Sequence, residues 1–341
     1  MSENIQEQEQ NEELFEHHRI EADPGQQPLR IDKFLHDRIA NSTRNKIQTA
    51  AKNGNILVND KAVKANYKVK ANDVISVVMP YPVREIELIA ENLPINIAYE
   101  DDEMVMVNKT PNMVVHPGYG NYKGTLVNAM LYHFENLPGA TKAECPRPGL
   151  VHRLDKDTSG IMVLAKSEDA LSHLSKQFFD RTINRRYQAI VWGDLKEEEG
   201  EIEGYIGRSH KDRKVMGVFD NEEQGKYALT RYKVLERFGY VTLVECKLET
   251  GRTHQIRAHF KHIGHPLFND STYGGDRVVK GTTFSKYKQF IANCFEICPR
   301  QALHAKLLEV DHPKTGKRIS VDSELPEDMQ NLMAKFRSYV N

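Results

Sequence analysis

The segment from His152 to Gly160 gathers charged side chains at one point of the chain. It reads His-Arg-Leu-Asp-Lys-Asp-Thr-Ser-Gly, and the apolar run 161–165 follows it directly. Asp155 is ionised at neutral pH unless it is desolvated, and the nearby Arg153 would help to keep its carboxylate available as a nucleophile or a base. A solvated turn before a buried strand would have a similar composition, because Asp, Thr, Ser and Gly all favour turns. Taken alone, this loop favours the turn, so a catalytic role needs support from the rest of the chain.

A large domain, which we place at residues 96–325, must position this loop. The hydrophobic patterns predict a hairpin over 97–109, helices near 126–134, 169–179 and 253–263, and strands at 160–165, 187–191, 230–235, 240–248 and 303–310. Strands follow one another more often than they alternate with helices, which favours an α+β fold with a mostly antiparallel mixed sheet. A helix at 326–341 is expected to end the chain.

Two segments of opposite charge precede this domain. Residues 1–27 hold eight acids and one basic residue, Arg19, whereas residues 28–80 hold ten Lys and Arg against four acids. Because the first segment has almost no apolar content up to Glu13, we expect an acidic, largely flexible tail, with residues 15–22 as a candidate strand. The second segment is a basic module, and a linker at 81–95 that begins with prolines joins it to the large domain.

The basic module at residues 28–80 is expected to be a small domain of two helices and a hairpin. Apolar residues recur at helical spacing from Leu29 onward, and Asp32 and Lys33 fall on the opposite, polar face. Ser42 is the expected N-cap of a second helix that ends at Gly54. Strands are expected at 56–58 and 74–77.

The composition narrows the class of protein. A chain of 341 residues with 39% apolar content and a net charge of −1 predicts a soluble, globular protein. It shows no membrane segment and no signal peptide, so we expect it in the cytoplasm. The cysteines have no short paired spacing and no usual zinc interval to a histidine, which predicts reduced thiols and no metal; they are Cys145, Cys246, Cys294 and Cys298. No dinucleotide or phosphate-loop motif is present, so no cofactor is expected.

The basic module resembles the S4 RNA-binding domain, named after a protein of the small ribosomal subunit. The resemblance is carried by the segments Arg30-Ile31-Asp32-Lys33-Phe34-Leu35, Ser42-Thr43-Arg44 and Asn53–Asn59. It implies that the first two helices present a basic face to structured RNA, with Arg30, Lys33, Arg44 and Lys46 as RNA-binding residues. Charge alone would favour a solvated surface, so the prediction of RNA binding depends on the resemblance.

Three stretches of the large domain resemble the signature motifs of the RluA/RluD family of RNA pseudouridine synthases. They are the loop 152–160, the segment Arg185-Arg186-Tyr187-Gln188-Ala189, and the segment 249–259 with Gly264-His265-Pro266-Leu267 and Asp270 after it. With the basic module, the resemblance covers residues 28–325. It implies isomerisation of uridine to pseudouridine without a cofactor: the glycosidic bond breaks, the base turns, and its C5 atom forms the new bond.

The resemblance also implies roles for single residues. Asp155 is the catalytic aspartate, and it must be ionised whether it attacks as a nucleophile or removes a proton by a glycal route; both routes remain open. Arg153 would fill the gap that a flipped uridine leaves in its stack. Tyr187 holds the position of the active-site tyrosine, although its strand pattern alone favours a tyrosine of the core.

A basic partner for Asp155 is expected because a buried carboxylate without a cation takes up a proton. We predict Arg257 for this role, with Arg252 as the competitor from the same motif. Helical spacing places His254 and Arg257 on one face, so His254 and Arg252 are expected to contact RNA phosphates. His116 and His304 are possible pocket-edge groups, and a structural role is favoured for both.

Several alternatives remain at this point. The basic module favours large-subunit ribosomal RNA, 23S RNA or the precursor of the large subunit, because it adds phosphate contacts on a structured RNA. Transfer RNA is the alternative substrate, and a non-catalytic RNA-binding assembly factor is the alternative function. A serine hydrolase is disfavoured because no Gly-x-Ser-x-Gly elbow is present. A monomer is expected; the uridines modified, the choice between D-type and C-type targets and the role of the acidic tail stay open.

Overall fold

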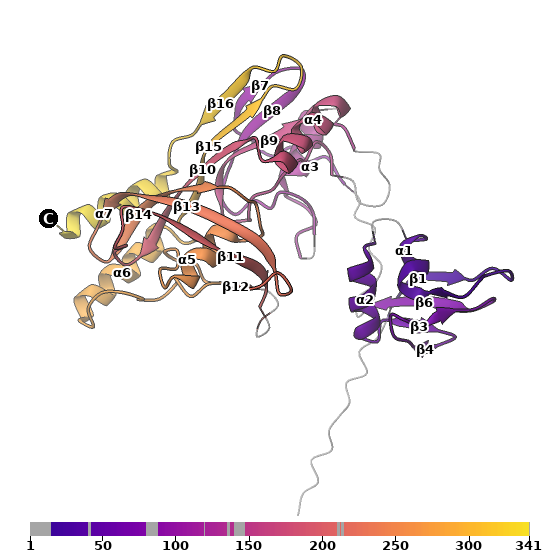
Figure 1. The fold of residues 1–341 in the computed structure, drawn as a ribbon. Coiled ribbons are helices and arrows are strands. Elements are labelled where there is room, and N and C mark those ends of the chain that lie inside the picture. Colours follow the sequence, from indigo (N-terminus) through magenta and orange to yellow (C-terminus); the bar gives the residue numbers. More distant parts are fainter. Residues whose placement is uncertain are drawn as a thin grey trace, which may run out of the picture. The chain divides into compact units, whose positions relative to one another are not determined.

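The computed structural model describes residues 15–39, 42–79, 88–118, 120–134, 137–139, 147–209, 212 and 215–340. The chain divides into a smaller unit before residue 88 and a larger unit from residue 88 onward (Figure 1). Residues 1–14 of the expected tail, residues 81–87 of the expected linker and Cys145 lie outside the described residues. No described helix is both long enough and apolar enough to span a bilayer.

The smaller unit contains the predicted helices and hairpin. Helices α1 (Ile31–His36) and α2 (Arg44–Lys52) pack with a sheet of order β1-β6-β3-β4, and a short pair β2-β5 accompanies them. The strands are β1 (Phe15–Glu21), β2 (Leu29–Arg30), β3 (Ile56–Val58), β4 (Lys61–Ala62), β5 (Lys68–Val69) and β6 (Val74–Met79). Their apolar faces enclose one core, which includes Ile31, Phe34 and Ile75.

Four details of the smaller unit differ from the expectation. The N-cap of α2 is Thr43, whose hydroxyl accepts a hydrogen bond from the Lys46 backbone N–H, while the Ser42 hydroxyl donates to the Ile39 carbonyl. Helix α1 spans only Ile31–His36, whereas the helical spacing of apolar residues starts at Leu29. Asp32 is fully buried rather than on a solvent face. Strand β1 pairs with β6, so the residues from 15 onward that we assigned to the tail belong to this unit.

A ten-stranded sheet forms the centre of the larger unit. Its order is β12-β11-β13-β14-β10-β15-β9-β8-β7, with β16 paired to β15. Every described pairing is antiparallel except that of β9 with β15, which confirms the mostly antiparallel α+β prediction. The strands are β7 (Ile97–Glu100), β8 (Met104–Lys109), β9 (Ser159–Ala165), β10 (Asn184–Trp192), β11 (Glu199–Arg208), β12 (Met216–Phe219), β13 (Lys226–Arg237), β14 (Val241–Leu248), β15 (Leu303–Asp311) and β16 (Arg318–Asp322).

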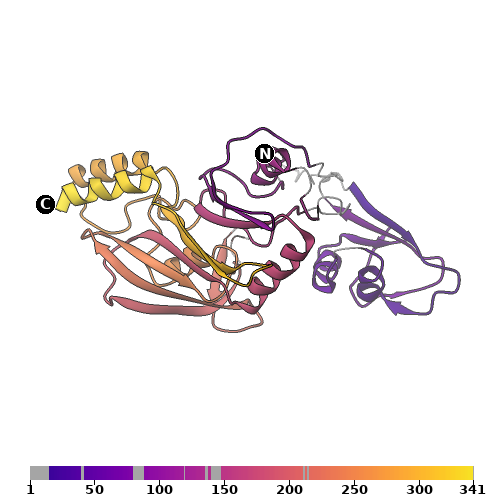
Figure 2. The same cartoon turned by 90° about the horizontal axis from the view of Figure 1, so that it is seen from above.

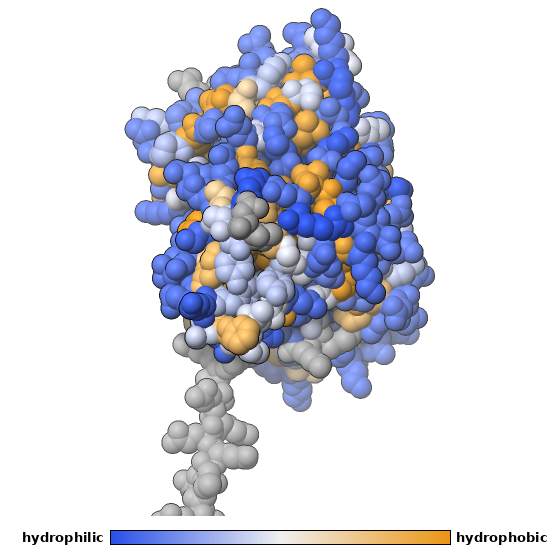
Figure 3. Space-filling view, turned by 90° about the vertical axis from the view of Figure 1, so that its left-hand side faces the viewer, coloured by the Kyte–Doolittle hydropathy of each residue, from blue (hydrophilic) through white to orange (hydrophobic). Residues whose placement is uncertain are grey.

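Helices cover this sheet in two groups. The predicted helices are present as α3 (Leu126–His133), α4 (Glu168–Asp180), α5 (Gln255–His262) and α7 (Glu327–Val340), and α6 (Ser285–Ile297) was not expected. Helices α6 and α7 lie side by side at one end of the sheet (Figure 2), where they enclose an aromatic core with Trp192 and Phe268. The side of the larger unit that carries α7 is mostly hydrophilic, with scattered apolar side chains (Figure 3).

Strand β10 runs through the middle of the sheet, between β14 and β15. The loop 152–158 leads into β9 on the far side of β15, and α5 begins after the end of β14. Neighbouring strands are ~5 Å apart. The fold therefore brings three segments that are far apart in sequence to one place.

Candidate active site

Two buried cations hold the backbone of the loop that carries Asp155. The Lys109 ammonium donates to the Lys156 carbonyl at 2.9 Å, and also to the carbonyls of Thr110 and Met113. Burial, together with the charge of Arg300, lowers the pKa of Lys109 to about 7. Arg300 donates to the carbonyl of residue 157 at 2.9 Å and is itself held by Asp328. Because both cations bind main-chain oxygens, they fix the path of the loop whatever its side chains do.

Asp155 is joined to a second acid through Arg257. Arg257 Nη1 donates to Asp155 Oδ2 at 3.0 Å, while its Nε and Nη2 donate to the two oxygens of Asp270 at 2.7 and 2.9 Å. Asp270 is fully buried, whereas the Asp155 side chain keeps 22% of its exposure. Burial would lower the pKa of Arg257, but Asp270 and Asp155 outweigh it and raise that pKa above its ordinary value. The guanidinium therefore stays charged and aims one N–H at Asp155.

His254 approaches Asp155 from a second direction. The Tyr273 hydroxyl accepts a hydrogen bond from the Met216 backbone N–H, so its own proton is available to His254 Nδ1, 3.0 Å away. The other ring nitrogen, Nε2, is 3.7 Å from Asp155 Oδ1, which is longer than a hydrogen bond. Burial lowers the pKa of His254 despite the nearby Asp155 charge, so the ring is neutral at physiological pH. His254 also has a left-handed backbone (φ 55°), which sets the ring at the start of α5.

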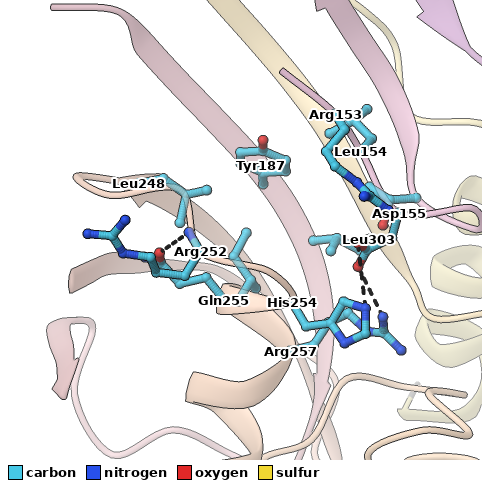
Figure 4. A pocket seen from close by; sticks show the side chains of 12 residues that line it. Arg153, Leu154, Asp155, Tyr187, Leu248, Arg252, His254, Gln255, Arg257 and Leu303 are labelled. Atoms are coloured by element: carbon cyan, nitrogen blue, oxygen red, sulfur yellow. Dashed lines mark hydrogen bonds and ion pairs between the residues drawn. The ribbon is translucent and has the colours of Figure 1, made fainter. Parts of the chain in front are cut away.

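These groups open onto a pocket that also contains Tyr187. The pocket is open to solvent and holds about 390 Å³ of space not filled by atoms, part of which is that solvent. In Figure 4 the Asp155 carboxylate is directed toward Arg257 and His254, and Tyr187 comes from β10. Tyr187 is buried to 7% exposure, and that burial raises its pKa. Its hydroxyl is therefore a neutral phenol at physiological pH, able to donate and accept hydrogen bonds.

The structure brings all six site residues predicted in the larger unit to this pocket. Asp155, Tyr187, Arg257, Arg153, Arg252 and His254 all line it. Arg257, not its competitor Arg252, contacts Asp155; Arg252 instead donates from Nε to the Tyr227 carbonyl. Arg153 is exposed and has no hydrogen-bond or ion-pair partner among the residues that the structure describes.

Two of the predicted histidines have structural contacts. His304 is buried between the hydroxyls of Ser159 and Ser323, at 2.9 and 2.8 Å, and does not line the pocket. His152 accepts a hydrogen bond from the Val163 N–H and stacks on Phe178, and burial lowers its pKa to about 3. Both histidines therefore bind residues of β9, the strand that follows the loop. His116, at the side of a separate loop, does not line the pocket either.

The predicted RNA-binding residues of the smaller unit are exposed around the two helices. Arg30 and Arg44 both donate to the buried Asp32 carboxylate, at 3.0–3.1 Å and 3.0 Å. Burial opposes ionisation of Asp32, but hydrogen bonds from Arg30, Gln48 and Arg44 outweigh it and hold its pKa well below the usual range. The exposed Arg30 and Arg44 side chains are thus held in place, and Lys33 and Lys46 are exposed beside them.

Sequence reasoning missed four supporting residues: Asp270, Tyr273, Lys109 and Arg300. Asp270 was noted only as part of a motif, and nothing in its spacing indicates that it binds Arg257. Lys109 and Arg300 lie far from residue 155 along the chain. The only local signal was that a Lys ends an apolar strand at position 109, where it is 2% exposed. Among the described residues, no His, Cys, Asp and Glu cluster could hold a metal.

Comparison with known proteins agrees with this geometry. The family model described as RNA pseudouridylate synthase matches residues 103–262, and the S4 domain model matches residues 29–75. An uncharacterized RNA pseudouridine synthase of Chlorobaculum parvum is 47% identical over 92% of this chain and 95% of its own length. The ribosomal large subunit pseudouridine synthase D of Nitrosomonas europaea is 39% identical over 91% of this chain and 85% of its own length.

Solved structures show the same fold. The structure titled Human RNA Pseudouridylate Synthase Domain Containing 4 aligns with a TM-score of 0.52 and 22% identity, over 71% of this chain and 93% of that one. Family models, long relatives and fold thus agree with the three motifs that meet at the pocket. The chain belongs to the RNA pseudouridylate synthase family, the enzymes that isomerise uridine to pseudouridine in RNA, and it carries an S4 domain before the catalytic domain.

Proposed function

We propose that this enzyme modifies specific uridines of large-subunit ribosomal RNA, 23S RNA or its precursor, with Asp155 as the catalytic residue. The observation that carries the assignment of Asp155 is its position: the only partly exposed carboxylate of the Asp155–Arg257–Asp270 chain opens onto the Tyr187 pocket. The relatives named ribosomal large subunit pseudouridine synthase D, from Nitrosomonas europaea and Pseudomonas aeruginosa, support the choice of RNA.

The chemistry of the site follows from its charges. Arg257 donates a hydrogen bond to Asp155, and both the nucleophilic and the glycal route require a carboxylate at that position. The glycosidic bond from N1 breaks, the uracil turns, C5 bonds to the same sugar carbon, the C5 proton leaves, and N1 takes up a proton. The reaction is redox-neutral, so all of these steps can take place between the RNA and the side chains of the pocket.

Tyr187 and Arg153 position the target base on our proposal. The Tyr187 ring can stack on a uracil in the pocket, and its neutral hydroxyl can relay the C5 proton by passing on its own proton as it receives that one. A uridine in a structured RNA reaches the pocket only when it is flipped out of its stack. Arg153 is exposed and unpaired among the described residues, and its planar guanidinium suits the gap that the flipped base leaves.

The smaller unit supplies affinity for the RNA. Arg30, Lys33, Arg44 and Lys46 contact phosphates on our proposal, and the buried Asp32 holds two of them in position. Replacing all four by Gln should weaken RNA binding and reduce its salt dependence, because each lost phosphate contact removes ~0.7–0.9 from the slope of log affinity against log salt. An unchanged salt slope would count against this face. We further propose that the enzyme is a monomer in the cytoplasm. Sedimentation of the purified enzyme tests the oligomeric state.

The central experiment is a pseudouridine map of ribosomal and transfer RNA from three strains: wild type, a deletion strain, and Asp155→Asn. We expect the same ribosomal sites to be lost in both altered strains, because the Asn side chain keeps the shape of Asp155 without its charge. Loss of sites only in transfer RNA would overturn the choice of RNA. Retained ribosomal sites in the Asp155→Asn strain would overturn the assignment of Asp155.

A further inference from the structure

Arg185 lies on the same face of β10 as Tyr187, two residues earlier in the strand. Strand β10 pairs with β14 without a register shift from Arg186 onward, and at the irregularity opposite Arg186 and Tyr187 the extra residue belongs to β15. Side chains of β10 therefore alternate between the two faces of the sheet. Arg186 accordingly points to the other face, where it donates to Glu245 at 3.0 Å. The two adjacent arginines therefore have different surroundings, and only Arg185 shares the face of the active-site tyrosine.

The Arg185 guanidinium lies between an aromatic ring and a glycine. Its central carbon is 5.7 Å from the centre of the Phe178 ring. On the other side is Gly251, where a Cβ atom would lie only 2.9 Å from Arg185 Nη1. Gly251 immediately precedes Arg252, which lines the pocket. The Arg185 charge also acts on Tyr187, where it opposes the effect of burial on the phenol pKa. Arg185 does not itself line the pocket, but it lies close to Tyr187 and to the residue before Arg252, which both do.

Among the residues that the structure describes, no acid neutralises Arg185. Its Nε is buried without a hydrogen-bond partner, and none of the described acids forms an ion pair with it. Arg237 and Arg337, by contrast, each pair with at least one carboxylate.

Neighbouring cations add to the positive charge. Burial and then the charge of Arg181 lower the pKa of Arg252, so guanidinium groups stand close together here. Arg153 adds another exposed guanidinium at the same pocket. A group of unneutralised guanidiniums is stabilised when an anion with several acceptor oxygens binds among them.

We propose that Arg185, together with Arg252, binds a backbone phosphate of the substrate RNA next to the uridine held in the Asp155–Tyr187 pocket. A phosphate offers acceptors to the buried Nε and to a terminal nitrogen at once, in the side-on geometry that arginine prefers. The contact carries no base information; it holds the RNA backbone beside the pocket and so contributes to affinity. This inference rests on the proposed function, because it takes RNA as the ligand.

The test compares Arg185→Gln with Arg186→Gln in the full-length enzyme. The matched control removes the same charge from the adjacent position on the opposite face. RNA affinity is measured over a range of salt concentrations, the rate at saturating RNA is measured separately, and thermal unfolding monitors the fold. Arg185→Lys is the conservative variant, which keeps the charge without the planar fork.

For Arg185→Gln we expect about a tenfold loss of affinity and a salt slope reduced by ~0.7–0.9, the value for one phosphate. The rate at saturating RNA should change much less than the affinity. Arg185→Lys should restore the slope, and Arg186→Gln should match the wild type. A slope in Arg185→Gln equal to that of Arg186→Gln would overturn the proposal and leave Arg185 as a packing residue for Phe178. If the wild-type enzyme binds RNA without converting it, the proposed function fails while the slopes still decide the role of Arg185.

Discussion

Replacing Arg257 by Lys separates the charge of this residue from its geometry. The guanidinium spans two carboxylates: Nε and Nη2 bind Asp270, and Nη1 binds Asp155. A lysine ammonium has one nitrogen on a flexible stem and cannot make the same planar set of contacts. Asp270 is fully buried and Asp155 is partly exposed. The ammonium should therefore stay with Asp270, since an unpaired buried charge is the costlier outcome.

The expected magnitudes follow from the bonds that are lost. Losing the bond to Asp155 removes one charge-assisted hydrogen bond, worth ~1.5–3 kcal/mol, and the conversion rate should fall roughly 10- to 150-fold if that bond orients the reacting carboxylate. The second bond to Asp270 is lost as well. The free energy of unfolding should drop by about 2–4 kcal/mol, less than the ~3–5 kcal/mol expected when a buried pair is broken completely.

The assay is single-turnover conversion of a ribosomal RNA fragment at saturating enzyme, with RNA affinity and denaturant unfolding measured on the same preparations. Arg231→Lys is the control, because Arg231 pairs with Glu201 and Glu249 in an exposed network; such pairs contribute ~0–1 kcal/mol. A folded Arg257→Lys enzyme with the wild-type rate would refute the argument that the Asp155–Arg257 contact serves catalysis.

Three further perturbations test how the fold supports the site. Gly160→Ala should destabilise the protein by about 3 kcal/mol, because the residue has φ 116° and a Cβ would meet the Ala305 carbonyl across the β9–β15 pair; wild-type denaturant stability would contradict this. The free energy of unfolding should fall as the pH is lowered from about 6.5 toward 4. Burial lowers the pKa of His152 to about 3 and those of His259 and His304 to about 4, so over this range only the unfolded chain binds these protons. A free energy of unfolding that stays constant over this range would contradict the argument. Asp32→Asn should weaken RNA binding, because Arg30 and Arg44 lose the carboxylate that holds them. The low pKa of Asp32 stabilises the folded protein above about pH 4, and this stabilisation disappears at lower pH, so the variant should lack it. RNA affinity and acid unfolding identical to those of the wild type would exclude this role.

Some elements could not be predicted because tertiary contacts override their local preferences. Strand β11 has glutamate or glycine at most of its positions, which are poor strand formers, yet it pairs along its length with β13. Helix α6 begins after Phe284 without a side-chain cap, so the sequence carries no start signal for it. Its buried face, with Tyr287 and Ile291, packs into the aromatic core beside α7. Burial of that face stabilises the helix where its sequence does not.

The amino-acid sequence by itself identified the family and predicted Asp155, Tyr187 and Arg257 as site residues, because each motif is a contiguous run whose residue types can be recognised without a structure. Only the tertiary structure decided which groups surround them. Asp270 anchors the Arg257 guanidinium, Lys109 and Arg300 hold the loop, and none of these contacts is local in sequence. The physical reason is that a buried ion pair forms only where the folded chain brings its two partners together. The path of the chain depends on the burial of apolar surface throughout the domain, and no local pattern of residues specifies that path.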